Sequence, residues 1–171
     1  MPSYWLMKSE PDECSISDVA NAPGHRVPWI GVRNYQARNF MRDQMRVGDG
    51  VLFYHSSCAE PGVAGLARVA STAYADASQF DATSPYFDAK SDPAQPRWLH
   101  VDVKHLASTP LLSLKAMRAR PALASMALLK PGSRLSITPV APQEWHAVLE
   151  ALVELGAGPD IGKLIAGVVP A

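Results

Sequence analysis

The densest cluster of side chains suited to binding chemistry lies between residues 29 and 40. The segment Trp29-Ile30-Gly31-Val32-Arg33-Asn34-Tyr35-Gln36-Ala37-Arg38-Asn39-Phe40 holds three aromatic rings, two arginines and two asparagines, in a chain that is only 8% aromatic. Proteins use flat rings beside guanidinium and amide groups to stack a nucleobase and to bond its edges. Composition alone leaves a second interpretation open, in which Trp29 fills the core and the arginines are solvated.

A second tryptophan stands out because of its place in an alternating pattern. In residues 97–106, Leu99, Val101 and Val103 alternate with polar side chains, which predicts a strand with these aliphatic residues on its core face. The same alternation puts Trp98 on the polar face. We expect Trp98 either to pack under a loop or to form part of a binding wall.

No arrangement of residues predicts catalysis. His55 lies beside Ser56 and three residues before Cys58, but no third group that would orient the histidine follows from the spacing. The sequence has no Gly-x-Ser-x-Gly elbow, and its five histidines form no helical metal-binding pair. Its two cysteines fit no metal or redox spacing. A hydrolase is therefore disfavoured, and we predict no metal site and no cofactor.

The charge of the chain is balanced overall but segregated along the sequence. Sixteen Lys and Arg face sixteen Asp and Glu, which argues against a protein that grips nucleic acid by bulk electrostatics. Between residues 97 and 134, however, the single acid Asp102 faces seven basic residues, which predicts a locally basic surface. The seven are Arg97, Lys104, Lys115, Arg118, Arg120, Lys130 and Arg134.

Length and hydropathy define the class of protein. A chain of 171 residues suits one domain with a single good core. No charged leader followed by an apolar run opens the sequence, and no window approaches the roughly 18 apolar residues of a membrane span. We therefore expect a soluble, cytoplasmic monomer.

Short strands and helices without regular alternation predict an α+β fold. The run at 51–55 is apolar on both faces, as in a buried strand, and Trp145, Val148, Leu149 and Leu152 form the core stripe of a last helix. The expected strands are 4–8, 51–55, 63–69, 97–106 and 134–139, and the expected helices are 16–20, 34–41, 114–120, 122–129 and a final one from 142 that Gly156 ends.

Several motifs together resemble the EVE domain family over roughly residues 3–150. They are Tyr4-Trp5-Leu6-Met7-Lys8-Ser9-Glu10-Pro11, Trp29-x-Gly31-Val32-Arg33-Asn34-Tyr35-Gln36-Ala37-Arg38-Asn39, Phe53-Tyr54-His55-Ser56, Pro61-Gly62-Val63-Ala64-Gly65, Ser84-Pro85-Tyr86, Pro96-Arg97-Trp98 and Gly132-Ser133-Arg134-Leu135-Ser136. The resemblance implies a PUA-like fold, which is a small, mostly antiparallel β-barrel flanked by helices and related to the YTH readers. It also implies a domain at 1–155, with a tail at 156–171 outside the resemblance.

The resemblance further implies a non-catalytic domain that binds a modified base in DNA or RNA, without distinguishing between the two nucleic acids or naming the modification. The pocket is expected between the end of the first strand, the Trp29 loop and the loop after Tyr54, with one face of Trp29 open to the base. The residues expected in the modified-base pocket are Ser9, Trp29, Asn34, His55, Ser56 and Trp98, and those expected to meet phosphate are Lys8, Arg33, Arg38 and Arg97.

Two alternatives stay open at this point. Trp29 and Trp98 are also suited to a protein-interaction module that binds a peptide or a methylated lysine through cation–π contacts. The neighbouring arginines favour nucleic acid, because they repel a cationic lysine and attract phosphate. Lys8 has an alternative role as well, since it can pair with Glu10 or Asp12 instead of binding phosphate.

Overall fold

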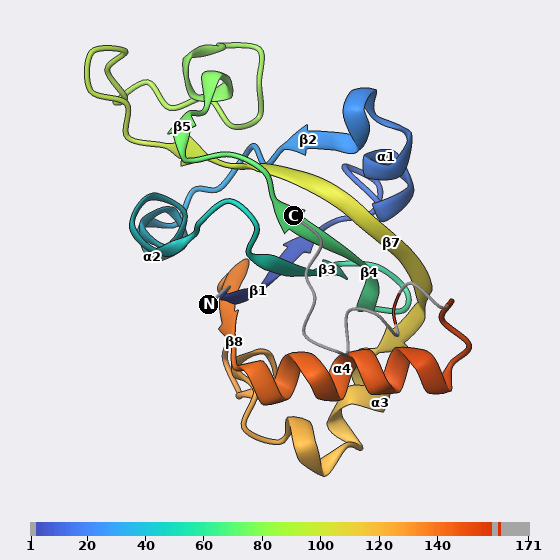
Figure 1. Ribbon diagram of the computed structural model, residues 1–171. Helices are drawn as coiled ribbons and strands as arrows, with labels where there is room; N and C mark the ends of the chain where they lie inside the picture. Colours follow the sequence, from blue (N-terminus) through green and yellow to red (C-terminus); the bar gives the residue numbers. More distant parts are fainter. Residues whose placement is uncertain (1–2, 159–160, 162–171) are drawn as a thin grey trace.

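The computed structural model describes residues 3–158 and residue 161 (Figure 1). Its strands are β1 (Tyr4–Ser9), β2 (Arg26–Pro28), β3 (Gly50–His55), β4 (Gly62–Val69), β5 (Tyr74–Ala75), β6 (Leu99–His100), β7 (Asp102–Ser113) and β8 (Ile137–Val140). Its α-helices are α1 (Ile16–Asn21), α2 (Tyr35–Asn39), α3 (Leu114–Arg118) and α4 (Pro142–Glu154), and a π-helical turn, Phe40–Gln44, continues α2.

Six of these strands form one mixed sheet in the order β2-β7-β4-β3-β1-β8. The β1–β3 pair is parallel and the other four pairings are antiparallel, while β5 and β6 form a separate two-stranded sheet. The predicted α+β class is confirmed, and so is the mostly antiparallel pairing. The sheet is open and does not close into a barrel, because β2 and β8 are its edges and do not pair with each other in the described part of the chain.

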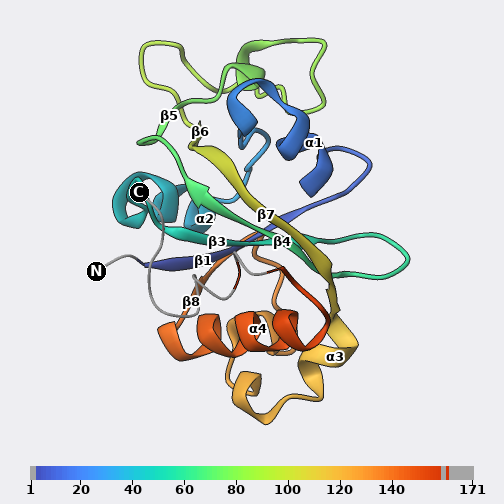
Figure 2. The same ribbon diagram turned by 45° about the vertical axis from the view of Figure 1, so that its right-hand side comes forward.

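Both faces of the central strands are buried, which explains why they are apolar on both sides. In β1, Tyr4 and Leu6 join one core cluster, while Trp5 and Met7 join the other. Successive side chains of a strand point to opposite faces, so one strand can serve two cores. The first core lies under α4, where Trp145 is fully buried, as its helical spacing predicts (Figure 2).

The structure corrects two predicted elements. The strand expected at 97–106 is interrupted at Val101, whose carbonyl accepts a hydrogen bond from the Trp29 backbone N–H (2.9 Å). On the N-terminal side of this break the burial pattern inverts, because His100 is buried and Leu99 is partly exposed. The helix expected at 122–129 is replaced by two short 3-10 turns.

The ends of the domain are only partly described. Ile161 packs into the core beneath α4 and is 2% exposed, whereas the rest of the expected tail beyond residue 158 lies outside the described residues. The limits 1–155 and 156–171 stay predictions. None of the described helices has both the length and the apolar character that crossing a membrane requires.

Candidate nucleic-acid interface

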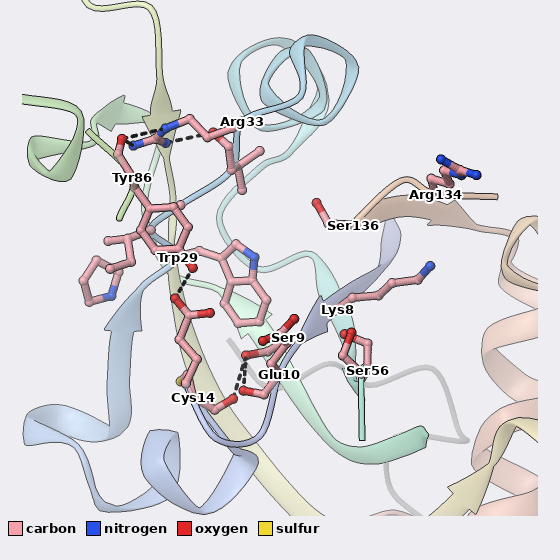
Figure 3. A pocket seen from close by; sticks show the side chains of 16 residues that line it. Lys8, Ser9, Glu10, Cys14, Trp29, Arg33, Ser56, Tyr86, Arg134 and Ser136 are labelled. Carbon is pink, nitrogen blue, oxygen red and sulfur yellow. Dashed lines mark hydrogen bonds between the residues drawn. The ribbon is translucent and has the colours of Figure 1, made fainter. Parts of the chain in front are cut away.

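A pocket of about 450 Å³ lies at one end of the central strands (Figure 3). Five parts of the chain contribute to it: the end of β1 with the following loop, the β2–α2 loop, the residues after β3, the long segment before β6, and the residues before β8. The side chains labelled in the figure are Lys8, Ser9, Glu10, Cys14, Trp29, Arg33, Ser56, Tyr86, Arg134 and Ser136.

The pairing of β1 with its two neighbours brings these segments together. Parallel pairing sets Ser9 opposite His55, and the Ser56 backbone N–H donates to the Ser9 carbonyl (3.0 Å). On the other side of β1, the Lys8 backbone N–H donates to the carbonyl of Ser136 (2.8 Å). Side chains 48 and 128 residues away from Lys8 therefore reach the same cavity.

Gly31 and Tyr86 form a closely fitted wall of the pocket. Gly31 has φ +85°, and a Cβ atom there would lie 2.6 Å from the Tyr86 ring, so the ring approaches the backbone more closely than any other residue at position 31 would allow. The Tyr86 hydroxyl donates to the carboxylate of Glu13. Burial, together with this hydrogen bond, raises the pKa of Tyr86 to about 12. Tyr86 is therefore neutral at physiological pH. Its hydroxyl is held by Glu13 and its ring lies against Gly31.

Two cations on the opposite side of the pocket have no acidic partner in the part of the chain that the structure describes. Neither Lys8 nor Arg134 forms an ion pair within the described residues, so the alternative pairing of Lys8 with Glu10 or Asp12 is not observed. Burial lowers the pKa of Lys8, because it penalises the charged ammonium group. Figure 3 shows both side chains across the pocket from Trp29 and Tyr86. An anion bound beside Lys8 would offset the cost of burying its charge.

Trp29 lines the pocket but is more deeply buried than the sequence suggests. Its side chain is 7% exposed and packs edge-on against Phe53, with ring centroids 5.4 Å apart. The part of the indole that is open to the pocket is therefore smaller than the one open face expected from the sequence, since the second core cluster covers most of the ring. Among the described residues the indole N–H has no hydrogen-bond partner, so it is available to a ligand.

Comparison with known proteins places the chain in a family. The model of the EVE domain family matches residues 3–151, which is most of the 171-residue sequence. The chain belongs to the EVE domain family. The family resemblance predicted from the sequence motifs is thus confirmed.

Individual relatives agree with this assignment. Thymocyte nuclear protein 1 of Homo sapiens is 39% identical over 166 residues, covering 87% of this chain and 73% of the relative. A solved hypothetical protein from Leishmania major is 47% identical with a TM-score of 0.86, covering 91% of this chain and 97% of that one. Human THYN1, solved in complex with 5-methylcytosine containing DNA, is 36% identical with a TM-score of 0.83, covering 92% and 99%. The EVE domain therefore has the expected PUA-like fold, built on an open sheet.

Within this EVE domain, Arg33 holds the structure together and is not free to bind phosphate. Its guanidinium group donates to the Tyr86 carbonyl (2.7 and 3.1 Å), to the Asp76 carboxylate (3.1 Å) and to the Ser78 hydroxyl (3.1 Å). Asp76 is fully buried, so its charge depends on this partner. The expected phosphate role of Arg33 is corrected, because tertiary contacts occupy its donors.

Asp76 gives the EVE domain a specific dependence of stability on pH. Burial by itself raises the pKa of Asp76, but hydrogen bonds from Ser78, from the Gly31 N–H and from Arg33 outweigh burial and lower the pKa below its ordinary value. Because the pKa of Asp76 is lower in the folded protein than its unfolded value of about 3.9, the ionised carboxylate stabilises the folded state at pH values above about 3.9. This stabilisation is lost as the pH falls through the pKa of the folded state.

We therefore expect Asp76→Asn to unfold more easily in urea than the wild type at pH 7, by about 1–3 kcal/mol, because several buried donors lose a charged acceptor. The difference should shrink below about pH 4, as the wild-type carboxylate itself becomes protonated. A difference of constant size from pH 7 to pH 3 would contradict the assigned ionisation of Asp76.

Three residues expected to read the base are engaged elsewhere. The Asn34 side chain caps α2 by accepting from the Ala37 N–H (3.1 Å), and His55 Nε2 accepts from the Ile16 N–H (3.2 Å), so neither lines the pocket. Ser9 does line it, but its hydroxyl donates to the Cys14 carbonyl (2.6 Å). Only the acceptor side of the Ser9 oxygen remains for a ligand.

Two of the remaining predicted residues, Arg38 and Arg97, line a second groove of about 500 Å³ together with Tyr35. Trp98 lies behind it, 6% exposed, with its ring stacked on Tyr35 at 4.9 Å and its N–H donating to Asp88 (2.8 Å). Arg97 lies 3.6 Å from Asp88, and Arg38 donates to the Arg97 carbonyl (3.0 Å). Trp98 does not line the Trp29 pocket, so the two rings form no joint cage for a methylated lysine.

Several lining residues were not predicted as site residues, although the sequence carried a signal for them. Tyr86 and the pair Arg134 and Ser136 belong to two of the motifs that carry the family resemblance, Ser84-Pro85-Tyr86 and Gly132-Ser133-Arg134-Leu135-Ser136. Glu10 and Glu13 lie in the loop that follows β1. In the described part of the chain no group of three or more His, Cys, Asp or Glu residues could hold a metal ion.

Proposed function

We propose that this EVE domain is a non-catalytic reader of DNA that holds a 5-methylcytosine in the Trp29 pocket. The observation that carries the proposal is the similarity, over 92% of this chain, to human THYN1 solved in complex with 5-methylcytosine containing DNA. The volume of the pocket, about 450 Å³, lies within the range of about 300–1,000 Å³ that is usual for small-ligand sites.

The lining of the pocket suits a base that has left its stack. Trp29 and Tyr86 supply apolar ring surface, the free indole N–H can donate to an acceptor on the base, and the lone pairs of Ser9 can accept from an amino group. Lys8 and Arg134 can meet the phosphates beside the base, since they lack acidic partners in the described structure.

Energetics explain how a protein with no net charge can still be selective. Extruding a base costs a few kcal/mol, and stacking returns about 1–3 kcal/mol. These contributions nearly balance for an unmodified base. A buried methyl group adds roughly 0.8 kcal/mol, which shifts the balance toward binding. Because the protein lacks a large positive charge, the Kd for unmodified DNA should lie in the usual non-specific range of about 10⁻⁴–10⁻⁶ M, or binding should be weaker still.

The test is a titration of matched oligonucleotides at one fixed salt concentration. DNA that contains 5-methylcytosine should bind more tightly than the same sequence with cytosine, and more tightly than the corresponding methylated RNA. Equal affinity for methylated and unmethylated DNA would overturn the proposal. A non-catalytic role is tested on the same oligonucleotides, which should be recovered chemically unchanged after incubation with the protein.

Lys8 and Arg134 provide a separate prediction about salt. Replacing either with alanine should weaken binding to methylated and unmethylated DNA by a similar factor, and should reduce the slope of log affinity against log salt by about 1. Lys115→Ala is the matched control, because Lys115 is exposed on α3 and does not line the pocket. An unchanged salt slope in Lys8→Ala and Arg134→Ala would exclude phosphate contacts by these two residues.

A further inference from the structure

Ile30 is an exposed apolar side chain at the pocket whose backbone is held on both sides. Its side chain is 46% exposed, whereas the adjacent Trp29 is 7% exposed, and both line the pocket. The Trp29 N–H donates to the Val101 carbonyl (2.9 Å), and the Gly31 N–H donates to the buried carboxylate of Asp76 (2.9 Å). Ile30 is therefore presented to solvent by a short segment that the core and a buried carboxylate fix in place.

A single exposed aliphatic residue is ordinary on a protein surface. Ile30 differs from the other exposed large hydrophobic residues because, of those in the described structure, it alone lines the pocket. Those others are Tyr35, Val47, Tyr74, Phe87, Val153 and Leu155. If a base were extruded into this cavity, the bases that flank it in the DNA would lie next to the Ile30 side chain.

We propose that Ile30 enters the base stack of duplex DNA at the gap left when the modified base turns into the pocket. Double-stranded DNA is therefore the form of DNA that the protein binds. This inference rests on the proposed function. Proteins that unstack DNA frequently insert apolar wedges such as isoleucine between base steps. A duplex requires such a wedge because extrusion exposes the flanking bases and the orphaned partner base, whereas a single strand has no partner base to leave behind.

The charges around the pocket fit the same geometry. Lys8 and Arg134 lie across the pocket from Trp29, which directly precedes Ile30 in the chain (Figure 3). A strand whose base occupies the pocket can then have its phosphates near the two cations while its neighbouring bases meet Ile30. The fixed backbone at residues 29–31 means that little freedom is lost when the side chain is inserted.

The test compares the affinity of each variant for 5-methylcytosine DNA as a duplex and as a single strand. Ile30→Ala should weaken duplex binding by roughly tenfold, since part of the few kcal/mol that extrusion costs is no longer offset. Its affinity for the single strand should change by less than about twofold, because no duplex has to be opened. Ile30→Leu should restore duplex binding, because it keeps an apolar wedge.

A duplex with a mismatch opposite the 5-methylcytosine gives a readout that a purely structural role of Ile30 would not change. Extrusion costs less from a mismatched pair, so the penalty of Ile30→Ala should become smaller with this ligand. Val47→Ala is the matched control: Val47 is 62% exposed, lies in the turn before β3 and does not line the pocket. It should leave the ratio of duplex to single-strand affinity unchanged.

The possible failures are distinguishable. If Ile30→Ala weakens duplex and single-strand binding equally, or weakens neither, the wedge is overturned while the reader function stands. A penalty that does not shrink with the mismatched duplex also overturns the wedge. If the wild type prefers methylated DNA in neither form, the proposed function fails, and the inference fails with it.

Discussion

Arg33→Ala will lower the free energy of unfolding by about 3–5 kcal/mol, which is the usual cost of removing one partner of a buried ion pair. The Arg33 side chain is 21% exposed and its partner Asp76 is 0% exposed, so the substitution leaves a buried carboxylate without its cation. It also removes the two hydrogen bonds to the Tyr86 carbonyl that attach the segment carrying Tyr86 to the pocket. Urea denaturation at pH 7 measures this loss.

Two further variants identify the cause of that loss. Arg33→Lys should recover only part of the stability, because an ammonium group cannot reproduce the planar set of donors that reaches Asp76, Ser78 and Tyr86 together. Arg42→Ala should leave the urea midpoint unchanged, since Arg42 pairs with Asp43 on the exposed surface. If Arg33→Ala is as stable as the wild type but binds DNA poorly, Arg33 is a phosphate ligand, as the family resemblance implies.

Trp29→Ala will also destabilise the EVE domain by about 3–5 kcal/mol, because it empties a large buried volume. The indole is 7% exposed and contacts Phe53 in the core. The sequence predicts an intact fold for this variant, and the structure reverses that expectation. Thermal or urea unfolding, followed by circular dichroism, measures the change. A Trp29→Ala protein as stable as the wild type would show that the indole contributes little to the core.

The binding role of Trp29 therefore needs a variant that keeps the core filled. Trp29→Phe retains an aromatic ring against Phe53 but removes the indole N–H and part of the stacking surface. The folded variant should lose most of its preference for methylated DNA, since stacking supplies about 1–3 kcal/mol per base. If Trp29→Phe folds and discriminates as the wild type does, the base is held by other residues, and Tyr86 becomes the next candidate.

Local patterns in the sequence determined the family, the α+β class and the core. The apolar run at 51–55 predicted a strand buried on both faces, the run at 4–8 predicted a strand, and the helical spacing around Trp145 predicted its place in the core. These features depend on which face of an element a side chain occupies, and strand and helix periodicity determines that directly. The family resemblance also placed Lys8, Ser9, Trp29 and Ser56 close together, and all four line one pocket of the structure.

Only the tertiary structure decided what each polar side chain does, because the partners are distant in sequence. Arg33 lies 43 residues before Asp76 and 53 before Tyr86, and Arg38 lies 59 residues before the carbonyl that it binds. A guanidinium group is equally suited to phosphate, to a carboxylate or to a carbonyl, so residue type alone cannot distinguish these roles. The sheet decides which segments lie side by side, and therefore why Arg33 and Trp98 are bonded to other parts of the chain while Lys8 and Arg134 have no acidic partner among the described residues.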